Sequence, residues 1–458
     1  MDQNKTMLTS DPMRTQAMGA FDPLKTQAMG AGFDPLKTTA MAAMGVADAG
    51  FTVEVVPSRE ATMANGPARE QFLLQINAGG TAPAGFTGTT GRTPLNLCLV
   101  IDRSGSMEGA PLEYVKQACS YVVDMLSPND ILSIVTFEET VDVLMSPQRV
   151  SAKQPIKDGI ARLQPGNTTN LYDGLALACQ QVSSISEPGR ATRMVVLTDG
   201  DPTAGIKDFS ALVTHAGEIK QRGISVTFLG FGPDYNEELL ASMAKKAGGN
   251  YYYIPRPEMI PEVFRTELEK LMTVTARNLK LTVKLARWVT MRSPQTASSG
   301  EISIPLTDME RGSTLEQVFD FDFPNHPLGH YRVASGKLSY EDLSTGQQQS
   351  VNVDFVMEFT ADAARYSAPV NPRVRQAADL VAASRAVERT VMGLKTGMIT
   401  QMGAVAELQK TQMLLVSQGR TGEAQEVTMA LRAIQSGNVD SAEKTLMGTM
   451  VQLDQGKH

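Results

Sequence analysis

Five oxygen-bearing side chains in three separate segments could hold a metal ion. The first segment carries a carboxylate and two hydroxyls on alternate residues of one short turn, so all three can point into a single pocket. The second segment offers a threonine, and the third a second carboxylate. Such hard oxygen ligands suit Mg²⁺ or Mn²⁺, and also Ca²⁺. The five residues are Asp102, Ser104, Ser106, Thr169 and Asp199.

The elements around these residues explain how they could meet. The apolar run Leu97–Ile101 leads directly into Asp102, and the run Met194–Thr198 leads into Asp199. Strand and helix patterns alternate over residues 93–272, and repeated units of this kind predict an α/β domain with a doubly wound parallel sheet. Because ligands bind at the carboxyl ends of such strands, the three segments are expected to converge there.

The rest of the chain divides by composition and periodicity. Residues 51–92 and 274–360 alternate in the manner of antiparallel strands, so we expect a β-sandwich into which the α/β domain is inserted. Residues 372–455 have helical spacing, and Asp440 with Glu443 predicts a capping box. Their methionines are expected in the core, with a helix-in-groove binding surface as the alternative. The predicted parts are a disordered tail (1–49), two sandwich segments (50–92 and 273–365), the α/β domain (93–272) and a helical region (366–458).

The order of these motifs resembles a known family. Asp-x-Ser-x-Ser, then Thr169-Asn-Leu, then Thr198-Asp-Gly is similar to the metal-ion-dependent adhesion site of von Willebrand factor A domains, and the resemblance covers about residues 93–272. Gly230-Phe-Gly-Pro-Asp and Ala247-Gly-Gly-Asn-Tyr resemble the end of that domain in bacterial members. The resemblance implies that Asp102, Ser104, Ser106 and Thr169 are ligands and that Asp199 acts through water. It also implies that a partner's carboxylate completes the coordination of the metal.

Two simpler interpretations stay open at this point. Asp102 and Ser104 could cap the following helix while Asp199 shapes a turn. Alternatively, a metal could serve stability alone. The order and spacing of the five residues favour the adhesion site over both of these interpretations.

Residues 1–49 contain a repeat with a threonine in each copy. Asp-Pro-Met-Arg-Thr15 recurs as Asp-Pro-Leu-Lys-Thr26 and Asp-Pro-Leu-Lys-Thr38, followed by Thr39 in the last copy. A basic residue precedes each threonine, and methionine follows three residues later, so the copies resemble ligands of forkhead-associated domains. We expect a docking tail, with phosphorylation by a kinase as one way to recruit such a partner. An unmodified docking motif and simple low complexity are the alternatives.

The composition of the chain narrows the choice of binding partners and of cellular compartment. A formal net charge of −7 gives no electrostatic reason to expect nucleic acid or an anionic membrane. No signal peptide or spanning segment is recognisable, and the three cysteines are expected to be buried free thiols. The sequence therefore predicts a cytoplasmic protein, and this argues against a surface adhesin.

Enzyme motifs are not recognisable in the sequence. The four histidines are scattered, and neither a nucleophile elbow nor a phosphate-binding loop is present. We therefore expect a non-enzymatic scaffold that binds proteins through a metal. A regulatory subunit of an AAA-type ATPase and a metal-dependent hydrolase or phosphatase are the alternatives.

Overall fold

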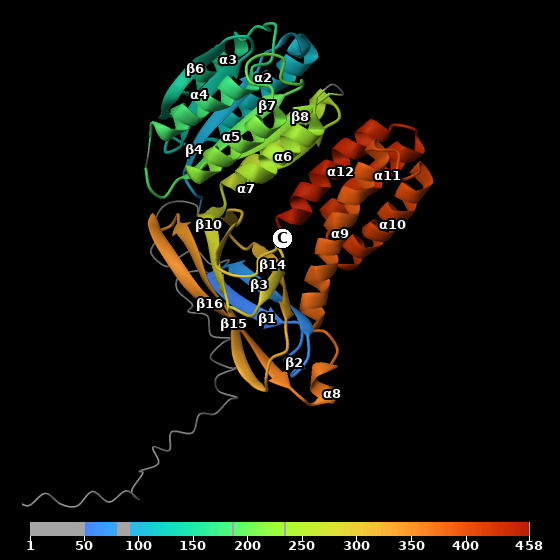
Figure 1. The fold of residues 1–458 in the computed structure, drawn as a ribbon. Helices are drawn as coiled ribbons and strands as arrows, with labels where there is room; N and C mark the ends of the chain where they lie inside the picture. The colour runs from blue at the N-terminus through green and yellow to red at the C-terminus, as the bar shows by residue number, and fades with distance from the viewer. Residues whose placement is uncertain (1–50, 80–91, 186, 233–234, 458) are drawn as a thin grey trace, which may run out of the picture. The chain divides into compact units, whose positions relative to one another are not determined.

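The computed structural model describes residues 51–79, 92–185, 187–232 and 235–457, and Figure 1 shows their helices and strands. They form an α/β domain, a β-sandwich and a helical region. This confirms the fold class predicted from the sequence, including the insertion of the α/β domain into the sandwich. The predicted disordered tail and its repeat threonines lie outside the described residues.

A six-stranded sheet forms the centre of the α/β domain. Its order is β6-β5-β4-β7-β8-β9, and every pair is parallel except β5 with β6. Every residue of β4, β5 and β8 is buried, as expected for strands covered on both faces. The strands are β4 (Leu95–Asp102), β5 (Ile131–Phe137), β6 (Val141–Arg149), β7 (Ala191–Thr198), β8 (Ser225–Phe231) and β9 (Tyr251–Ile254).

Six helices cover the two faces of this sheet. Side chains alternate along β4, so that Cys98 and Val100 pack toward one set of helices while Leu97 and Leu99 pack toward the other. The first set is α4 (Leu171–Ser183), α5 (Phe209–Gln221) and α6 (Glu237–Ala247). The second set is α2 (Ala110–Met125), α3 (Lys153–Ala161) and α7 (Ile260–Leu271), with the short helices η1 (Gly105–Met107) and η2 (Pro257–Met259) nearby.

The sandwich joins strands from both sides of the α/β domain in sequence. One sheet has the order β1-β3-β14-β11, and the other has β12-β10-β15-β16-β2 with β13 beside β10. Phenylalanines from β3, β14 and β16 meet edge to face between the sheets, including Phe72 with Phe355 at 5.7 Å. The strands are β1 (Phe51–Pro57), β2 (Ala61–Met63), β3 (Ala68–Ala78), β10 (Val274–Leu285), β11 (Thr290–Ser293), β12 (Glu301–Pro305), β13 (Met309–Glu310), β14 (Thr314–Phe323), β15 (Gly329–Asp342) and β16 (Gln347–Thr360).

The helical region follows the sandwich. After the short α8 (Ala363–Tyr366) it consists of α9 (Pro372–Lys395), α10 (Gln401–Ser417), α11 (Thr421–Gln435) and α12 (Val439–Asp454). The predicted capping box at Asp440 is wrong. Asn438 caps α12 instead, because its side chain accepts a hydrogen bond from the Ser441 N–H at 3.1 Å, which places Asp440 inside the first turn.

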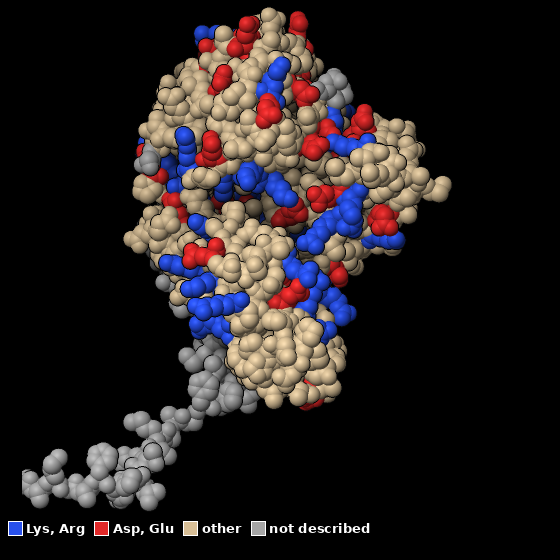
Figure 2. All heavy atoms as spheres, viewed as in Figure 1, with Lys and Arg blue, Asp and Glu red and all other residues tan. Residues whose placement is uncertain are grey.

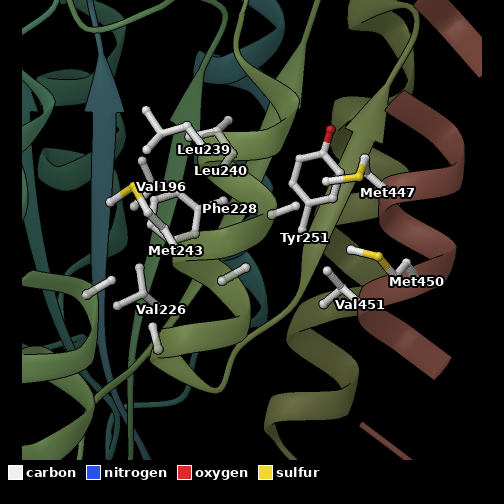
Figure 3. Close-up of a cluster of buried hydrophobic side chains, with 14 of the residues drawn as sticks. Val196, Val226, Phe228, Leu239, Leu240, Met243, Tyr251, Met447, Met450 and Val451 are labelled. Carbon is white, nitrogen blue, oxygen red and sulfur yellow. The ribbon is translucent and has the colours of Figure 1, made fainter. Parts of the chain in front are cut away.

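Helix α12 packs against the α/β domain. Figure 3 shows Met447, Met450 and Val451 beside Tyr251 of β9, in the same apolar cluster as Phe228 of β8. The predicted core role is therefore confirmed for these two methionines. The α12 contact also covers the last strand of the sheet, which would otherwise expose an unprotected edge.

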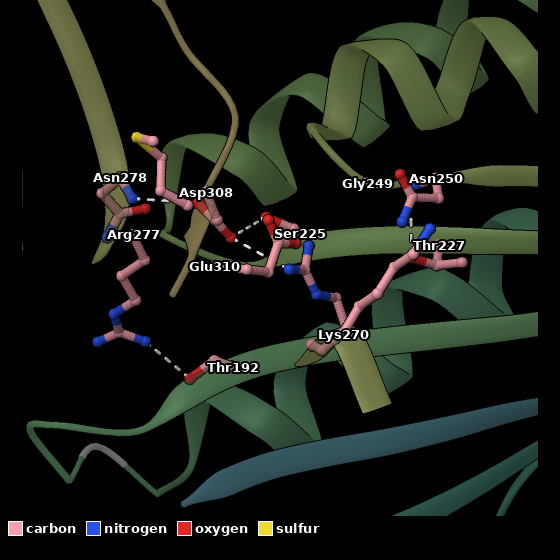
Figure 4. Close-up of polar contacts among 12 residues, drawn as sticks. Thr192, Ser225, Thr227, Gly249, Asn250, Lys270, Arg277, Asn278, Asp308 and Glu310 are labelled. Atoms are coloured by element: carbon pink, nitrogen blue, oxygen red, sulfur yellow. Dashed lines mark hydrogen bonds and ion pairs between the residues drawn. The ribbon is translucent and has the colours of Figure 1, made fainter. Parts of the chain in front are cut away.

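A buried polar cluster joins the α/β domain to the sandwich (Figure 4). The Asp308 carboxylate, between β12 and β13, accepts hydrogen bonds from Lys220 at 3.1 Å, Ser225 at 3.0 Å and Arg193 at 3.3 Å. It also accepts the Asn278 backbone N–H of β10 at 3.2 Å. Burial alone would raise the pKa of Asp308, but the charges of Lys220 and Arg193 hold it well below its usual range.

Three further features are the cysteines, the surface charge and the apolar length of the helices. All three cysteines are buried and unpaired, as predicted. Figure 2 shows basic and acidic side chains interspersed over much of the visible face. Among the described residues, no helix combines the length and the apolar character needed to cross a bilayer.

Candidate metal centre

The end of β4 delivers a fully buried carboxylate. Asp102 is the last residue of the strand, and its Oδ1 accepts the Ser104 N–H at 2.8 Å. Its Oδ2 accepts the hydroxyl of Thr198, the last residue of the neighbouring strand β7, at 2.6 Å. Burial raises the pKa of Asp102 to about 7, and the nearby Asp199 carboxylate also raises it. An ionised Asp102 is therefore costly unless a cation compensates its charge.

Two serine hydroxyls connect this turn to the end of β7. The Oγ atoms of Ser104 and Ser106 lie 3.1 Å apart, and Ser106 donates to Asp199 Oδ1 at 2.7 Å. Asp199 follows β7 directly, so the two strand ends place their oxygens at one point. Four of the five predicted residues are thereby in one hydrogen-bonded chain.

The threonine loop lies beside the same turn. A methyl group added to Gly200 would lie 3.5 Å from Ser106 Oγ and 3.6 Å from Thr169 Oγ1, so both hydroxyls border Gly200. The Thr169 N–H donates to Thr203 Oγ1 at 2.8 Å, which fixes the loop against the segment after β7. The structure thus joins four of the predicted residues by hydrogen bonds and places the fifth, Thr169, beside Gly200.

Backbone contacts hold two of the loops in register. The Gly105 N–H donates to the Asn167 carbonyl at 3.1 Å, and the Gly166 N–H donates to the Arg103 carbonyl at 2.5 Å. A Cβ at Gly105 would lie 3.3 Å from the Asn167 carbonyl oxygen, so a side chain there would have to push this loop away slightly. Asn170 then caps α4 by accepting the Asp173 N–H.

The centre opens to solvent on one side. Asp102, Ser104, Thr169 and Asp199 are buried, whereas Ser106 is exposed. Beyond the site, the segment after Asp199 carries two exposed apolar side chains, Ile206 (44% exposed) and Phe209 (41% exposed).

Sequence reasoning did not foresee the supporting roles of Thr198 and Thr203. Thr198 was part of the Thr198-Asp-Gly motif, but its hydrogen bond to Asp102 appears only in the structure. Thr203 lies in an exposed loop, and only its contact with Thr169 shows its role. The position of Thr203 carries no local signal that could have identified it.

Comparison with known proteins agrees with this architecture. The family model for the von Willebrand factor type A domain matches residues 96–266, so the chain contains such a domain. Two solved structures share the fold at low identity. The von Willebrand factor type A protein from Catenulispora acidiphila has a TM-score of 0.66 and 17% identity, over 82% of this chain and 89% of that one. The ArnB paralog VWA2 from Sulfolobus acidocaldarius has a TM-score of 0.63 and 16% identity, over 88% of this chain and 98% of that one.

Similar sequences occur in proteins of different lengths. The Synechocystis protein sll0103 is 31% identical over 56% of this chain and 64% of its own length. Escherichia coli YfbK is 29% identical over 43% of this chain and 34% of its own length. Human inter-alpha-trypsin inhibitor heavy chain H4 is 26% identical over 54% of this chain and 30% of its own length. The chain thus spans less than two thirds of each of these relatives. Domains of this family commonly mediate metal-dependent protein–protein interaction.

Proposed function

We propose that the chain is a protein-interaction scaffold that holds an acidic side chain of a partner through a divalent cation at the candidate metal centre. The observation that carries this proposal is the buried Asp102 carboxylate beneath a linked series of oxygens from Ser104, Ser106 and Asp199.

The donor set fits Mg²⁺ or Mn²⁺. Two carboxylates and three hydroxyls are hard oxygen ligands, and neither a thiol nor an imidazole is among the five. Among the residues that would hold the cation directly, Asp102 alone bears a negative charge, so a bound divalent cation would keep a net positive charge toward one more carboxylate. Asp102, Ser104, Ser106 and Thr169 would hold the cation, with Asp199 contributing through its contact with Ser106.

The exposed apolar residues after Asp199 suggest which side chain accompanies the partner's acidic group. Ile206 and Phe209 follow Thr203 within one exposed segment, and Thr203 contacts Thr169. Burial of an exposed apolar side chain is worth about 25 cal/mol for each Å² removed from water. We therefore propose that the partner presents an apolar side chain next to its carboxylate.

We also propose that the chain acts by binding rather than by catalysis. The described histidines contact other groups: His215 stacks on Tyr172, His326 lies against Trp288 in the sandwich, and His330 is 3.5 Å from Glu358. Because its three thiols are buried and unpaired, a reducing compartment such as the cytoplasm suits the chain.

Affinity purification from the native host tests the proposed function. With Mg²⁺ present, the wild-type chain should retain a partner that EDTA releases, and Asp102→Asn should retain none. The matched control is Asp158→Asn, an exposed aspartate of α3 that should behave like wild type. A partner that stays bound in EDTA and to Asp102→Asn would refute the proposal.

The N-terminal repeats supply a second proposed contact. We propose that phosphorylation of Thr15, Thr26 and Thr38 or Thr39 recruits a forkhead-associated domain, since phosphate adds about −1.5 to −2 charges that pair with arginines. Several copies on one tail would raise avidity. Mass spectrometry of chain isolated from its host should find phosphothreonine in the repeats. Full peptide coverage without phosphate, over several growth states, would contradict this part.

A further inference from the structure

Glu138 follows β5 directly and lies beside the turn that begins at Asp102. In the sheet, Asp102 is paired with Phe137, and the Arg103 N–H donates to the Phe137 carbonyl at 3.0 Å. Glu138 is the next residue after this pair, so it adjoins Arg103. Its side chain is only 13% exposed, which is low for a glutamate on a loop.

The two oxygens of the Glu138 carboxylate have partners in two different loops. Oε1 accepts a hydrogen bond from the Arg103 guanidinium at 3.3 Å, and Arg103 stands between Asp102 and Ser104 in the metal-binding turn (residues 102–106). Oε2 accepts the Asn167 N–H at 3.2 Å, which belongs to the threonine loop (residues 165–170). The carboxylate therefore joins the metal-binding turn to the threonine loop.

The backbone of Glu138 also bonds to the threonine loop. Its carbonyl accepts the Asn170 N–H at 3.0 Å. Because Asn167 and Asn170 lie on either side of Thr169 in the sequence, Glu138 holds the loop both before and after this predicted ligand. The Thr169 carbonyl in turn accepts the Thr203 N–H at 3.0 Å. These bonds together fix the backbone around Thr169.

Gly166 leaves the space that the Glu138 carboxylate occupies. A Cβ at Gly166 would lie 2.7 Å from Glu138 Oε2 and 2.8 Å from its Cδ, which is closer than such atoms normally approach. An alanine at this position would therefore displace the carboxylate from the Asn167 N–H. The substitution Gly166→Ala disturbs the same contact from the loop side, without removing any charge.

Ligands that are held in place before a cation arrives lose less freedom when it binds. Residues behind the ligands often supply this support, and their loss lowers metal affinity about 10- to 100-fold. We propose that Glu138 is a positioning residue of the metal centre, which holds Thr169 beside the metal-binding turn through its bonds to Arg103 and Asn167. This inference rests on the proposed function, since it requires that the centre binds a divalent cation.

Calorimetric titration of the full chain with Mn²⁺ tests the positioning role. Glu138→Ala should bind Mn²⁺ at least about 10-fold more weakly than wild type. Glu138→Gln should recover most of the affinity, because its amide oxygen can still accept the Asn167 N–H. Gly166→Ala should also weaken binding, and the double variant with Glu138→Ala should bind little worse than Glu138→Ala alone, since both changes break one contact. The matched control, Glu139→Ala, removes the same charge from an exposed neighbour and should bind like wild type.

Amide hydrogen exchange in EDTA gives a readout that needs no metal. Residues 166–170 should exchange faster in Glu138→Ala than in wild type, while β4 and β7 should exchange as before. Wild-type Mn²⁺ affinity in Glu138→Ala would overturn the positioning role. Equally weak binding by Glu138→Gln would also overturn it, because the charge alone would then matter. A wild-type chain that binds no Mn²⁺ would instead refute the metal centre itself, so the two failures can be told apart.

Discussion

Millimolar Mg²⁺ should raise the thermal unfolding midpoint of the wild-type chain and leave that of Asp102→Asn unchanged. A ligand that binds only the folded state stabilises it by about 2.7 kcal/mol when present at about 100 times its Kd. Asp102 is buried, and its pKa is raised to about 7, so its charge is uncompensated until a cation binds. Differential scanning calorimetry with Mg²⁺ and with EDTA measures both effects.

The same experiment has a second expected result in EDTA. Because its pKa is raised, folding favours the protonated form of Asp102. The charged form therefore begins to destabilise the fold as the pH rises above 3.8, the ordinary pKa, and the effect is complete above about pH 7. At pH 8 without metal, Asp102→Asn should therefore be at least as stable as wild type, because the amide can still accept from the Ser104 N–H and donate to Thr198.

The control is again Asp158→Asn, which should respond to Mg²⁺ as the wild type does. An unchanged wild-type midpoint in Mg²⁺ would contradict the metal centre. An equal shift in Asp102→Asn would show that the cation acts somewhere else on the chain.

Asp308→Asn should cause the largest loss of stability in the absence of metal. Removal of one partner from a buried ion pair costs about 3–5 kcal/mol, since the remaining charge stays buried. In this variant two cations, Arg193 and Lys220, would lose the carboxylate that they share. Chemical denaturation followed by circular dichroism measures the loss as a shift of the midpoint.

The pH dependence and a matched variant sharpen this prediction. Because folding lowers the pKa of Asp308, its carboxylate stabilises the fold above pH 3.8, and this effect is lost as the pH falls below that value. Wild type and Asp308→Asn should therefore become more alike in stability in acid. Asp354→Asn removes a surface partner of Arg332 at 3.1 Å and should cost at most about 1 kcal/mol. If both variants lose the same stability, Asp308 does not hold the α/β domain to the sandwich.

Much of the α/β domain could be predicted from local patterns. The apolar run Leu97–Ile101 lies within strand β4 (Leu95–Asp102), and the run Met194–Thr198 lies within β7 (Ala191–Thr198). Buried parallel strands are apolar on both faces, so their sequence separates them clearly from the polar loops that follow. The convergence of the site residues followed from the rule that parallel strands end on the same edge.

The sandwich and the junction could be predicted only in part. Within residues 274–360 the alternation is weak over strand β15 (Gly329–Asp342), because its sequence mixes glycine, serine and lysine with apolar residues. The Asp308 cluster has no local signature, since its partners lie 30 to 115 residues away in the sequence. Helix α10 buries Ala404, Leu408, Thr411 and Leu415. The expectation that the methionines of this region lie in the core is wrong for Met402 and Met413, which are exposed on the other side of the helix.

Anomalous diffraction from crystals grown with Mn²⁺ is the most direct test of the central claim. The claim predicts one strong peak among the oxygens of Asp102, Ser104, Ser106 and Thr169, with a coordination position that carries water or a carboxylate from outside the chain. An empty site at saturating Mn²⁺ would contradict it, and so would a donor from the same chain in that last position.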